Sequence, residues 1–343
     1  MIQMWPLVSV VIPHCGGYKI LSECLLSLEK SEYQNLEVIV VDNASLDNSI
    51  YKIKKNFSDV KILKSEYNRG FASGCNFGVE HALGEFILIL NNDTVHKKHW
   101  IDLLVKKINS DSKISSVQPK IKNFQRNEYF DYAGASGGFI DKYGFPFSRG
   151  RIFNTIEKDL GQYDNACQIF WASGTAFLTR KNIFNKIGGF DETFFAHMEE
   201  IDYHWKCQLL GYKIWVEPES EIYHHGGFTL PSSSPKKTYL NYRNSLIVFM
   251  TNNNFKLVIK LILFRLILDM IAFLKELIVL KWMHSLAIIK SWIWVFFHPY
   301  ILFKRKLLIK KISKKSNVDG IFQKSIVLEY FFKRKVYYNQ IKK

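Results

Sequence analysis

Four short apolar runs within the first ninety residues are the feature that most constrains the fold. They are typical of strands that are apolar on both faces, and segments with helical spacing separate them. Such strands occur where helices cover both sides of a mainly parallel sheet. The sequence therefore predicts an α/β fold with a mainly parallel central sheet. The four expected strands are residues 8–12, 37–41, 60–63 and 86–90.

The segments between these strands predict three helices. Residues 18–30 carry one apolar stripe, which consists of Ile20, Cys24, Leu25 and Leu28. Asp47 can cap a short second helix that runs to Phe57. Residues 71–83 form a third, glycine-rich helix.

Polar residues follow three of the four expected strands. These residues are His14, Asp42 with Asn43, and Asn91 to Asp93. Ligands bind at the carboxyl ends of strands in sheets of this kind, although Asn and Asp also favour such positions for turn formation alone. Two acidic strand ends in one half of the sheet favour a binding crevice. The chain has neither GxGxxG after a strand nor GxxxxGK[ST], which disfavours a dinucleotide or P-loop site.

Charge divides the chain into two parts. The formal net charge is +16, and residues 243–343 hold 20 of the 47 basic residues but only 4 of the 31 acidic ones. Residues 1–242 are therefore neutral overall, which predicts a compact unit, whereas the basic and apolar remainder predicts contact with an anionic surface. We expect this surface to be a membrane and expect no nucleic-acid partner, because the sequence has no recognisable nucleic-acid-binding motif.

The basic part is apolar but interrupted by charges. Residues 255–303 carry too many charged residues for a membrane span, so helices lying in the membrane interface are expected. Trp282, Trp292 and Trp294 suit the headgroup zone, and a run of lysines and one arginine follows over residues 304–315. The alternative is a helical hairpin that packs on the first part and exposes a basic face.

The ends and the cysteines carry little further information. The N-terminal stretch has no basic residue before its short apolar run, so no signal peptide is expected. The five cysteines are scattered without a CxxC pair, which predicts reduced thiols and a cytoplasmic protein. With the basic part, this predicts a protein held at the inner face of the cell membrane.

Six motifs in order carry a resemblance to a known family. They are VSVVIP, EVIVVDNASLDNS, NRGFASGCNFGVEHALGEFILILNND, FWASGTAFLTR, IGGFDETFFAHMEEID and YHHGG. Together they resemble family 2 glycosyltransferases of the GT-A fold, in the branch that includes bacterial rhamnosyltransferase-like enzymes. The resemblance covers roughly residues 7–245 and implies a GT-A catalytic domain over residues 1–242, followed by the helical region 243–343.

The resemblance implies an inverting transfer of one sugar. The donor would be a UDP- or dTDP-sugar, with dTDP-rhamnose suggested by the branch, and the acceptor a hydroxyl of a growing cell-surface polysaccharide or lipid-linked glycan. The chain lacks QxxRW, the motif of processive synthases, which favours single addition. A sugar nucleotidyltransferase and an inactive scaffold that binds nucleotide sugar or membrane are the alternatives.

The resemblance also assigns residues to the donor. Asp42 resembles the aspartate that accepts a hydrogen bond from the base, with a turn into the following helix as the alternative. Arg69 could pair with phosphate or be an ordinary surface residue. The remaining donor contacts implied are Pro13, Asn68, Gly70, Asn76 and Asn92.

A divalent metal is implied at the end of the fourth strand. Asp93 resembles the last acid of the family's DxD motif, with Asn91 where many relatives have the first aspartate. One carboxylate suffices for Mg²⁺ or Mn²⁺ because the donor's phosphates supply further oxygens. His224 resembles the histidine that completes the site, although the neighbouring His225 is an alternative for this role. Gly226 and Gly227 would let the backbone approach phosphate.

The base and the acceptor pocket complete the expected site. Glu200 is expected to deprotonate the acceptor hydroxyl, with Glu199 orienting acceptor or metal, although acids also favour helix N-termini for electrostatic reasons. The family usually has Glu-Asp here, so Glu200 stands at the Asp position. The acceptor pocket is expected to include Trp171, Ser173 and Gly174, with Trp171 either stacking on a sugar or packing in the core.

Overall fold

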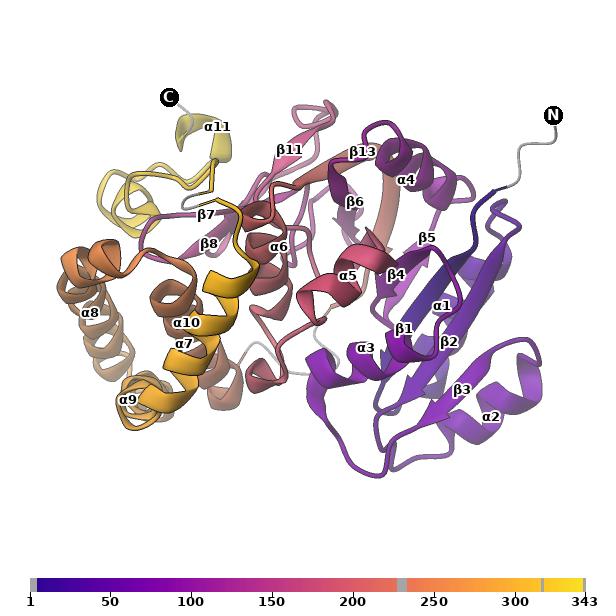
Figure 1. Ribbon diagram of the computed structural model, residues 1–343, viewed down its shortest axis with the longest axis horizontal. Helices are drawn as coiled ribbons and strands as arrows, with labels where there is room; N and C mark the ends of the chain where they lie inside the picture. Colours follow the sequence, from indigo (N-terminus) through magenta and orange to yellow (C-terminus); the bar gives the residue numbers. More distant parts are fainter. Residues whose placement is uncertain (1–4, 227–232, 316–317, 342–343) are drawn as a thin grey trace.

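The computed structural model describes residues 5–226, 233–315 and 318–341 (Figure 1). Gly227 and the first four residues of the N-terminal stretch lie outside these ranges. The fold is a mixed sheet of nine strands between helices, with a layer of C-terminal helices at one end.

The first half of the sheet is the predicted parallel unit. Its strands are β1 (Val8–His14), β2 (Leu36–Asp42), β3 (Lys61–Lys64) and β4 (Phe86–Leu90), in the order β4-β1-β2-β3. The helices between them are α1 (Tyr18–Glu29), α2 (Ser49–Asn56) and α3 (Gly70–Glu80). The four expected strands and three expected helices are thus all present. The four residues of the predicted apolar stripe on α1 are buried.

One predicted boundary was wrong. Pro13 does not end the first strand, which continues to His14 and pairs with β2 along its whole length. The pairing with β4 reaches only Val11, so the proline lies where β1 is an edge on one side and its missing N–H is tolerated.

The second half extends the sheet beyond β4. The strands are β5 (Thr94–His96), β6 (Ile114–Asn123), β11 (Cys167–Ile169), β12 (Ala176–Arg180) and β13 (Lys213–His224). β12 runs antiparallel to β4 and β6, whereas β13 runs parallel to β6. More residue pairs are parallel than antiparallel across the sheet, so the predicted α/β class is confirmed.

Helices and a small sheet complete this part of the chain. The helices are α4 (Trp100–Asn109), α5 (Lys181–Ile187), the single turn η1 (Glu192–Phe194) and α6 (Glu199–Leu209). The small antiparallel sheet contains β7 (Gly138–Ile140), β8 (Pro146–Ser148), β9 (Arg151–Ile152) and β10 (Thr155–Ile156). The central sheet has a buried apolar cluster on each face, one that includes Leu25 and Trp100 and one that includes Phe177 and Tyr203.

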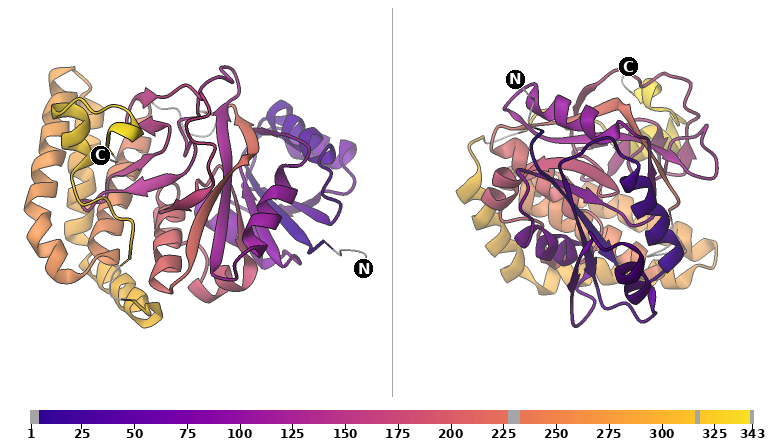
Figure 2. Two further views of the ribbon diagram at one scale, coloured as in Figure 1. Left: turned by 90° about the horizontal axis from the view of Figure 1, so that it is seen from above. Right: turned by 90° about the vertical axis from the view of Figure 1, so that its right-hand side faces the viewer.

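The C-terminal region is helical, as predicted, and packs on the rest. Its elements are α7 (Pro235–Asn252), α8 (Phe255–Ile278), α9 (Trp282–Phe297), α10 (Pro299–Ile312), η2 (Leu328–Phe332) and α11 (Tyr338–Ile341). The predicted boundary after residue 242 falls inside α7, whose residues Leu246 to Val248 pack against Trp205 of α6. Figure 2 shows α7 to α10 gathered at the end of the molecule opposite β3 and α2.

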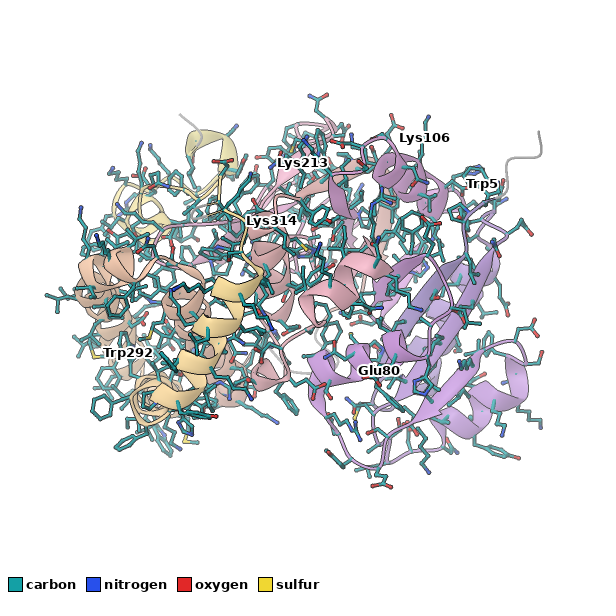
Figure 3. The ribbon with its side chains drawn as sticks, viewed as in Figure 1. Trp5, Glu80, Lys106, Lys213, Trp292 and Lys314 are labelled. Carbon is teal, nitrogen blue, oxygen red and sulfur yellow. The ribbon has the colours of Figure 1, made fainter. Side chains whose placement is uncertain are left out.

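The three tryptophans expected at a membrane interface do not behave alike. Trp282 is 60% exposed. Trp292, labelled in Figure 3, donates a hydrogen bond from Nε1 to Asp269, and Trp294 stacks on His298. The last two tryptophans are half-buried among the C-terminal helices, and their place at a membrane interface stays a prediction.

The length and hydropathy of the C-terminal helices show which of them could cross a membrane. Within the ranges that the structure describes, no single helix is both long and apolar enough to cross a bilayer, whereas α9 and α10 together pass that test across a bend of 72°.

Candidate active site

The carboxyl ends of β1, β2 and β4 lie side by side and carry buried polar groups. Asp42 ends β2, and its Oδ1 accepts a hydrogen bond of 2.8 Å from the Ser45 backbone N–H. The turn weighed as the alternative is therefore present. It also fixes the direction of the carboxylate, because one oxygen is held by the backbone.

His14 at the end of β1 links the start of α2 to the segment that follows β4. Its Nδ1 lies 2.8 Å from the Asn92 amide nitrogen, which can only donate, so the neutral ring donates from Nε2 to the Ser49 hydroxyl at 3.0 Å. Burial lowers the pKa of His14 to about 4, despite the nearby Asp47 and Asp42, so the ring stays neutral at physiological pH. Asn92 is therefore positioned by His14, which takes one of the two N–H donors of its amide.

The loop before α3 is built around Asn43. The Asn43 amide donates to Asn68 Oδ1 and to the Gly70 carbonyl, and its Oδ1 accepts from the Arg69 backbone N–H. Gly70 has a φ of +81°, and a Cβ there would lie 2.4 Å from the Phe195 carbonyl oxygen. Only glycine fits this position.

Two residues expected to touch ligands have structural roles instead. Asn76 donates to the Phe190 carbonyl at 2.8 Å and accepts from the Phe190 N–H at 2.9 Å, so its amide is consumed in joining α3 to the segment before η1. Trp171 is buried, and its Nε1 donates to the Phe139 carbonyl at 2.8 Å. The amide of Asn76 is therefore already bonded within the protein, and at Trp171 the alternative of core packing is the one present.

Arg69 remains at the surface. Its guanidinium lies over the rings of Tyr67 and Phe77, at 5.1 and 5.7 Å from their centroids. Neither contact neutralises the charge, so the side chain stays available for an anion.

Asp93, which follows β4, is one of two carboxylates that flank a buried histidine. His224, the last residue of β13, has its Nε2 3.0 Å from Asp93 Oδ1 and its Nδ1 2.9 Å from Asp131 Oδ1. Burial alone would lower the pKa of His224, but the two carboxylates raise it to about 10. The same imidazolium holds the pKa of Asp93 below its ordinary value, against the opposing effect of burial.

This arrangement could hold a divalent cation once His224 has lost its Nε2 proton, because an imidazolium cannot ligate a metal. Among the described residues, the buried Asp93 Oδ1 has no partner besides its ion pair with His224 Nε2. Asp131 holds Nδ1 and turns Nε2 toward Asp93, as second-sphere carboxylates do for metal-binding histidines. The described residues offer no cluster of three protein ligands, so a cation here would need oxygens from the donor and water.

The neighbouring histidine faces elsewhere. His225 Nε2 lies 3.2 Å from Glu23 Oε2, and its ring stacks on Phe124. Of the two histidines, His224 is therefore the one that can ligate a cation beside Asp93.

Two glutamates begin α6, as predicted. Burial, reinforced by the charge of Glu200, raises the pKa of Glu199 well above its ordinary value. Burial also raises the pKa of Glu200 to about 7, although backbone N–H groups at the helix start and from Gly174 favour the charged form. Among the described residues, Oε2 of each glutamate is buried without a hydrogen-bond partner.

Glu200 and the pair Asp93 and His224 are joined through one edge of the sheet. The Asn91 N–H donates to the Thr175 carbonyl at 2.9 Å, and the adjacent Gly174 lies against Glu200. Ser173 is buried and donates to the Ala133 carbonyl at 2.6 Å, two residues from Asp131. Ser173 therefore supports the edge, while Gly174 leaves room beside Glu200.

The site therefore combines buried carboxylates with a buried histidine. Comparison with known proteins identifies the family to which the chain belongs. The family model described as "Glycosyl transferase family 2" matches residues 9–188. The chain belongs to glycosyltransferase family 2.

Known glycosyltransferases resemble this family 2 glycosyltransferase along part of its length. It is 29% identical over 196 residues to glycosyltransferase GlyG of Streptococcus pneumoniae, covering 54% of this chain and 60% of that protein. It is 22% identical to the N-acetylglucosaminyl-diphospho-decaprenol L-rhamnosyltransferase of Mycobacterium tuberculosis, covering 60% and 71%. The chain spans 36% of the length of an uncharacterized glycosyltransferase from Haemophilus influenzae.

Solved structures agree with the GT-A fold. The mannosyltransferase PcManGT from Pyrobaculum calidifontis, in complex with GDP-Man and Mn²⁺, superposes with a TM-score of 0.53 at 13% identity, covering 92% of this chain and 88% of that one. GalNAc-T7 with UDP, GalNAc and Mn²⁺ gives 0.57 at 16% identity, covering 73% and 48%.

The family 2 site contains residues that sequence reasoning missed. Asp131 lies far from Asp93 and His224 in the chain, in a YFDYAG segment that carries no metal-binding spacing. Arg243 and Asn244 were missed as well, because α7 carries polar residues along much of its length and no local pattern distinguishes this pair.

Arg243 and Asn244 hold the segment that leads into the glutamates. The buried Asn244 amide nitrogen lies 3.0, 2.9 and 2.7 Å from the carbonyl oxygens of Phe194, Ala196 and His197. Arg243 donates to the Phe194 carbonyl at 3.1 Å and to Asn244 Oδ1 at 2.8 Å. This segment has three non-glycine residues with positive φ: Phe195, His197 and Met198. Such backbone persists only where its surroundings impose it.

We expect Asn244→Ala to slow transfer by about 10- to 100-fold with little change in donor affinity, because the segment before Glu199 relaxes and the base moves. The lost hydrogen bonds should also lower the free energy of unfolding by roughly 1–3 kcal/mol. The control is Asn254→Ala, which removes the cap of the exposed start of α8 at a cost of about 1 kcal/mol. Steady-state kinetics and chemical denaturation test both. Equal rate loss in the two variants would show that Asn244 acts through stability alone.

Proposed function

We propose that this protein is an inverting, metal-dependent hexosyltransferase that adds a single sugar to a lipid-linked glycan or growing polysaccharide of the bacterial cell surface. The observation that carries the proposal is the shared sheet edge, where Asp93 and His224 lie beside the segment that packs against Glu200. A carboxylate with a raised pKa and a cation site are the two devices that transfer from a nucleotide diphosphate requires.

The proposed reaction is a single displacement. Glu200 takes the proton of the acceptor hydroxyl as its oxygen attacks the anomeric carbon, and the bond from that carbon to the diphosphate breaks. Attack opposite the leaving group inverts the configuration. A bound Mg²⁺ or Mn²⁺ would be held by Asp93 and His224 and would neutralise charge on the leaving diphosphate.

The donor and acceptor classes rest on relatives. The mycobacterial relative is named as a rhamnosyltransferase acting on a diphospho-decaprenol, and an Escherichia coli relative, 35% identical over 97 residues, as a UDP-Glc-dependent glucosyltransferase acting on a diphosphoundecaprenol. We propose a UDP- or dTDP-sugar as donor, with Asp42 facing the base and Asn68, Arg69 and Gly70 closing over the nucleotide. A processive synthase is the second candidate, because a poly-β-1,6-N-acetyl-D-glucosamine synthase of Staphylococcus epidermidis is 27% identical over 207 residues.

A donor screen tests the proposal. Thermal shift with UDP-, dTDP- and GDP-sugars, each with and without Mn²⁺, should show one uridine or thymidine donor that stabilises the protein only when the metal is present. A hundredfold excess over Kd corresponds to about 2.7 kcal/mol of stabilisation. If no nucleotide sugar changes Tm, the proposal of an active transferase fails and the inactive scaffold is left.

We also propose that the C-terminal helices rest on the inner face of the cell membrane. The support is an exposed apolar surface on α8, α9 and α10, next to the lysine-rich end of α10. Its largest exposed members are Phe255, Ile259, Leu263, Ile278, Leu280, Trp282, Phe296, Phe297, Tyr300 and Phe303. The cytoplasmic leaflet is anionic, and each nearby lysine or arginine adds about 1 kcal/mol.

Vesicle sedimentation checks this location. The protein should sediment with phosphatidylglycerol-containing vesicles and much less with pure phosphatidylcholine, and added salt should weaken the binding because it screens the lysines. Equal binding to the two vesicle types would contradict an electrostatic contribution. Absence of binding to both would contradict the proposed membrane location.

A further inference from the structure

A cavity between α10 and η1 is lined by residues that are not part of the candidate active site. Its volume is about 510 Å³, and its walls combine apolar side chains of α10 with charged ones. The charged members are Lys304, Arg305, Lys311 and Asp191, three cations against one carboxylate. A solvent-accessible cavity with apolar walls and excess positive charge suits an amphiphilic ligand with an anionic head group and an apolar chain.

The cations differ in how they are held. Arg305 is buried, with its two terminal nitrogens paired to Asp191 and Asp202, the latter at 2.8 Å. Its Nε is buried and has no hydrogen-bond partner among the described residues. Because both terminal nitrogens are paired and Nε is shielded from solvent, Arg305 fixes the inner wall of the cavity, and the two lysines are the cations that a ligand can reach.

The two lysines are free of ion pairs. Within the described part of the chain, neither Lys304 nor Lys311 has an acidic partner, and both are exposed at the cavity. They lie seven residues apart on α10 and therefore face the same side of the helix. Two exposed ammonium groups on one side of a helix can both donate to phosphate oxygens.

The apolar walls continue onto the surface proposed to meet the membrane. Tyr300, Leu307 and Leu308 line the cavity and are also exposed. Figure 1 shows α10 beside α9 and across from α6, and Lys314, labelled in Figure 3, follows the end of α10. The cavity is thus open to an amphiphile whose tail lies along the membrane-facing helices.

The cavity is also joined to the catalytic helix. Asp202, which pairs with Arg305, lies two residues after Glu200 on α6, and Asp191 caps η1, which leads into the segment held by Asn244. A ligand bound at Arg305 therefore sits next to the support of the catalytic base rather than on a remote surface.

We propose that this cavity binds the diphosphate head group of the lipid that carries the acceptor sugar. The proposal rests on the proposed function, because it gives the lipid-linked acceptor a place on the protein. Lys304 and Lys311 would contact the phosphate oxygens, and Tyr300 and Leu307 would flank the start of the lipid chain.

The test compares vesicle binding by the full chain and a double variant, in the absence of any donor. The probe is phosphatidylcholine vesicles containing undecaprenyl diphosphate, with phosphatidylglycerol vesicles of equal charge as the comparison. Lys304→Ala with Lys311→Ala should weaken binding to the diphosphate vesicles on the order of 100-fold, because two charge-assisted hydrogen bonds to phosphate are lost. Binding to the phosphatidylglycerol vesicles should weaken much less. The control, Lys54→Ala with Lys55→Ala on exposed positions of α2, removes the same charge far from the cavity and should bind as the wild type does.

Three results would overturn the proposal. The first is unchanged binding of the double variant to diphosphate vesicles. The second is an equal loss on phosphatidylglycerol vesicles, which would indicate general attraction to anionic membranes, and the third is an equal loss in the α2 control. Donor-induced thermal shift of the double variant separates this proposal from the proposed function. If no nucleotide sugar binds either protein, the transferase proposal fails while the vesicle result still decides what the cavity holds.

Discussion

Glu200→Gln is expected to lower the rate of sugar transfer by at least about 100-fold while nucleotide-sugar binding stays unchanged. The amide has nearly the same shape as the carboxylate but cannot accept the proton of the acceptor hydroxyl. Transfer assays with thermal-shift titration of the donor measure the two effects separately. Turnover close to that of the wild type would place the base elsewhere, with Glu199 the next residue to test.

The pH dependence provides a second readout of the same residue. Because the pKa of Glu200 is raised to about 7, the base is protonated below that pH, and the wild-type rate should fall as pH drops through 7. The raised pKa also means that the charged form destabilises the folded state once pH exceeds the unfolded value near 4.5. Glu200→Gln should therefore be more stable than wild type at pH 8, by up to about 3 kcal/mol, with no such difference below pH 4.5.

A matched control is available at an exposed carboxylate. Glu219→Gln removes the same charge at an exposed position of β13 and should change neither the rate nor the pH dependence of stability. If both variants gained stability alike, the gain would reflect net charge rather than the buried site.

Asp93→Asn is expected to weaken metal-dependent donor binding by at least about 100-fold, because the amide oxygen lacks the charge that holds a divalent cation beside His224. Without metal, wild type and variant should bind the nucleotide sugar equally weakly. Titration of Mn²⁺ in the presence of donor, followed by thermal shift, measures the difference. Equal Mn²⁺ dependence in both proteins would remove Asp93 from the cation site.

Asp131→Asn is the informative companion to that experiment. This residue reaches the proposed ligand set only through His224 Nδ1, so its effect should be smaller, about 10- to 100-fold in metal affinity. A loss equal to that of Asp93→Asn would mean that Asp131 binds the cation directly.

Local pattern was sufficient for the parallel half of the sheet and for the start of α6. The apolar runs at 37–41 and 86–90 are buried strands because burial on both faces leaves a continuous apolar signature. Glu199 and Glu200 were placed in the first turn of a helix by the spacing of Ile201, Trp205 and Leu209, and all three of these apolar side chains are buried. The order of the six motifs indicated the glycosyltransferase family.

The same patterns could not assign partners to polar side chains. Asn76 lies in a glycine-rich motif that resembles a donor loop, yet Phe190 takes both ends of its amide. Trp171 was equally compatible with stacking and with core packing, and the approach of Gly138 to its ring decided for the core. Such outcomes depend on segments more than thirty residues away.

The sequence by itself determined the α/β class, the family and the positions of Asp42, Asp93 and Glu200 at ends of strands or helices, because backbone periodicity and local motifs report burial and chain direction. Only the tertiary structure decided that Asp131 orients His224 and that Asn244 supports the segment before Glu199. The physical reason is that a hydrogen bond or ion pair acts over about 3 Å, and which side chains come that close is set by the packing of distant segments.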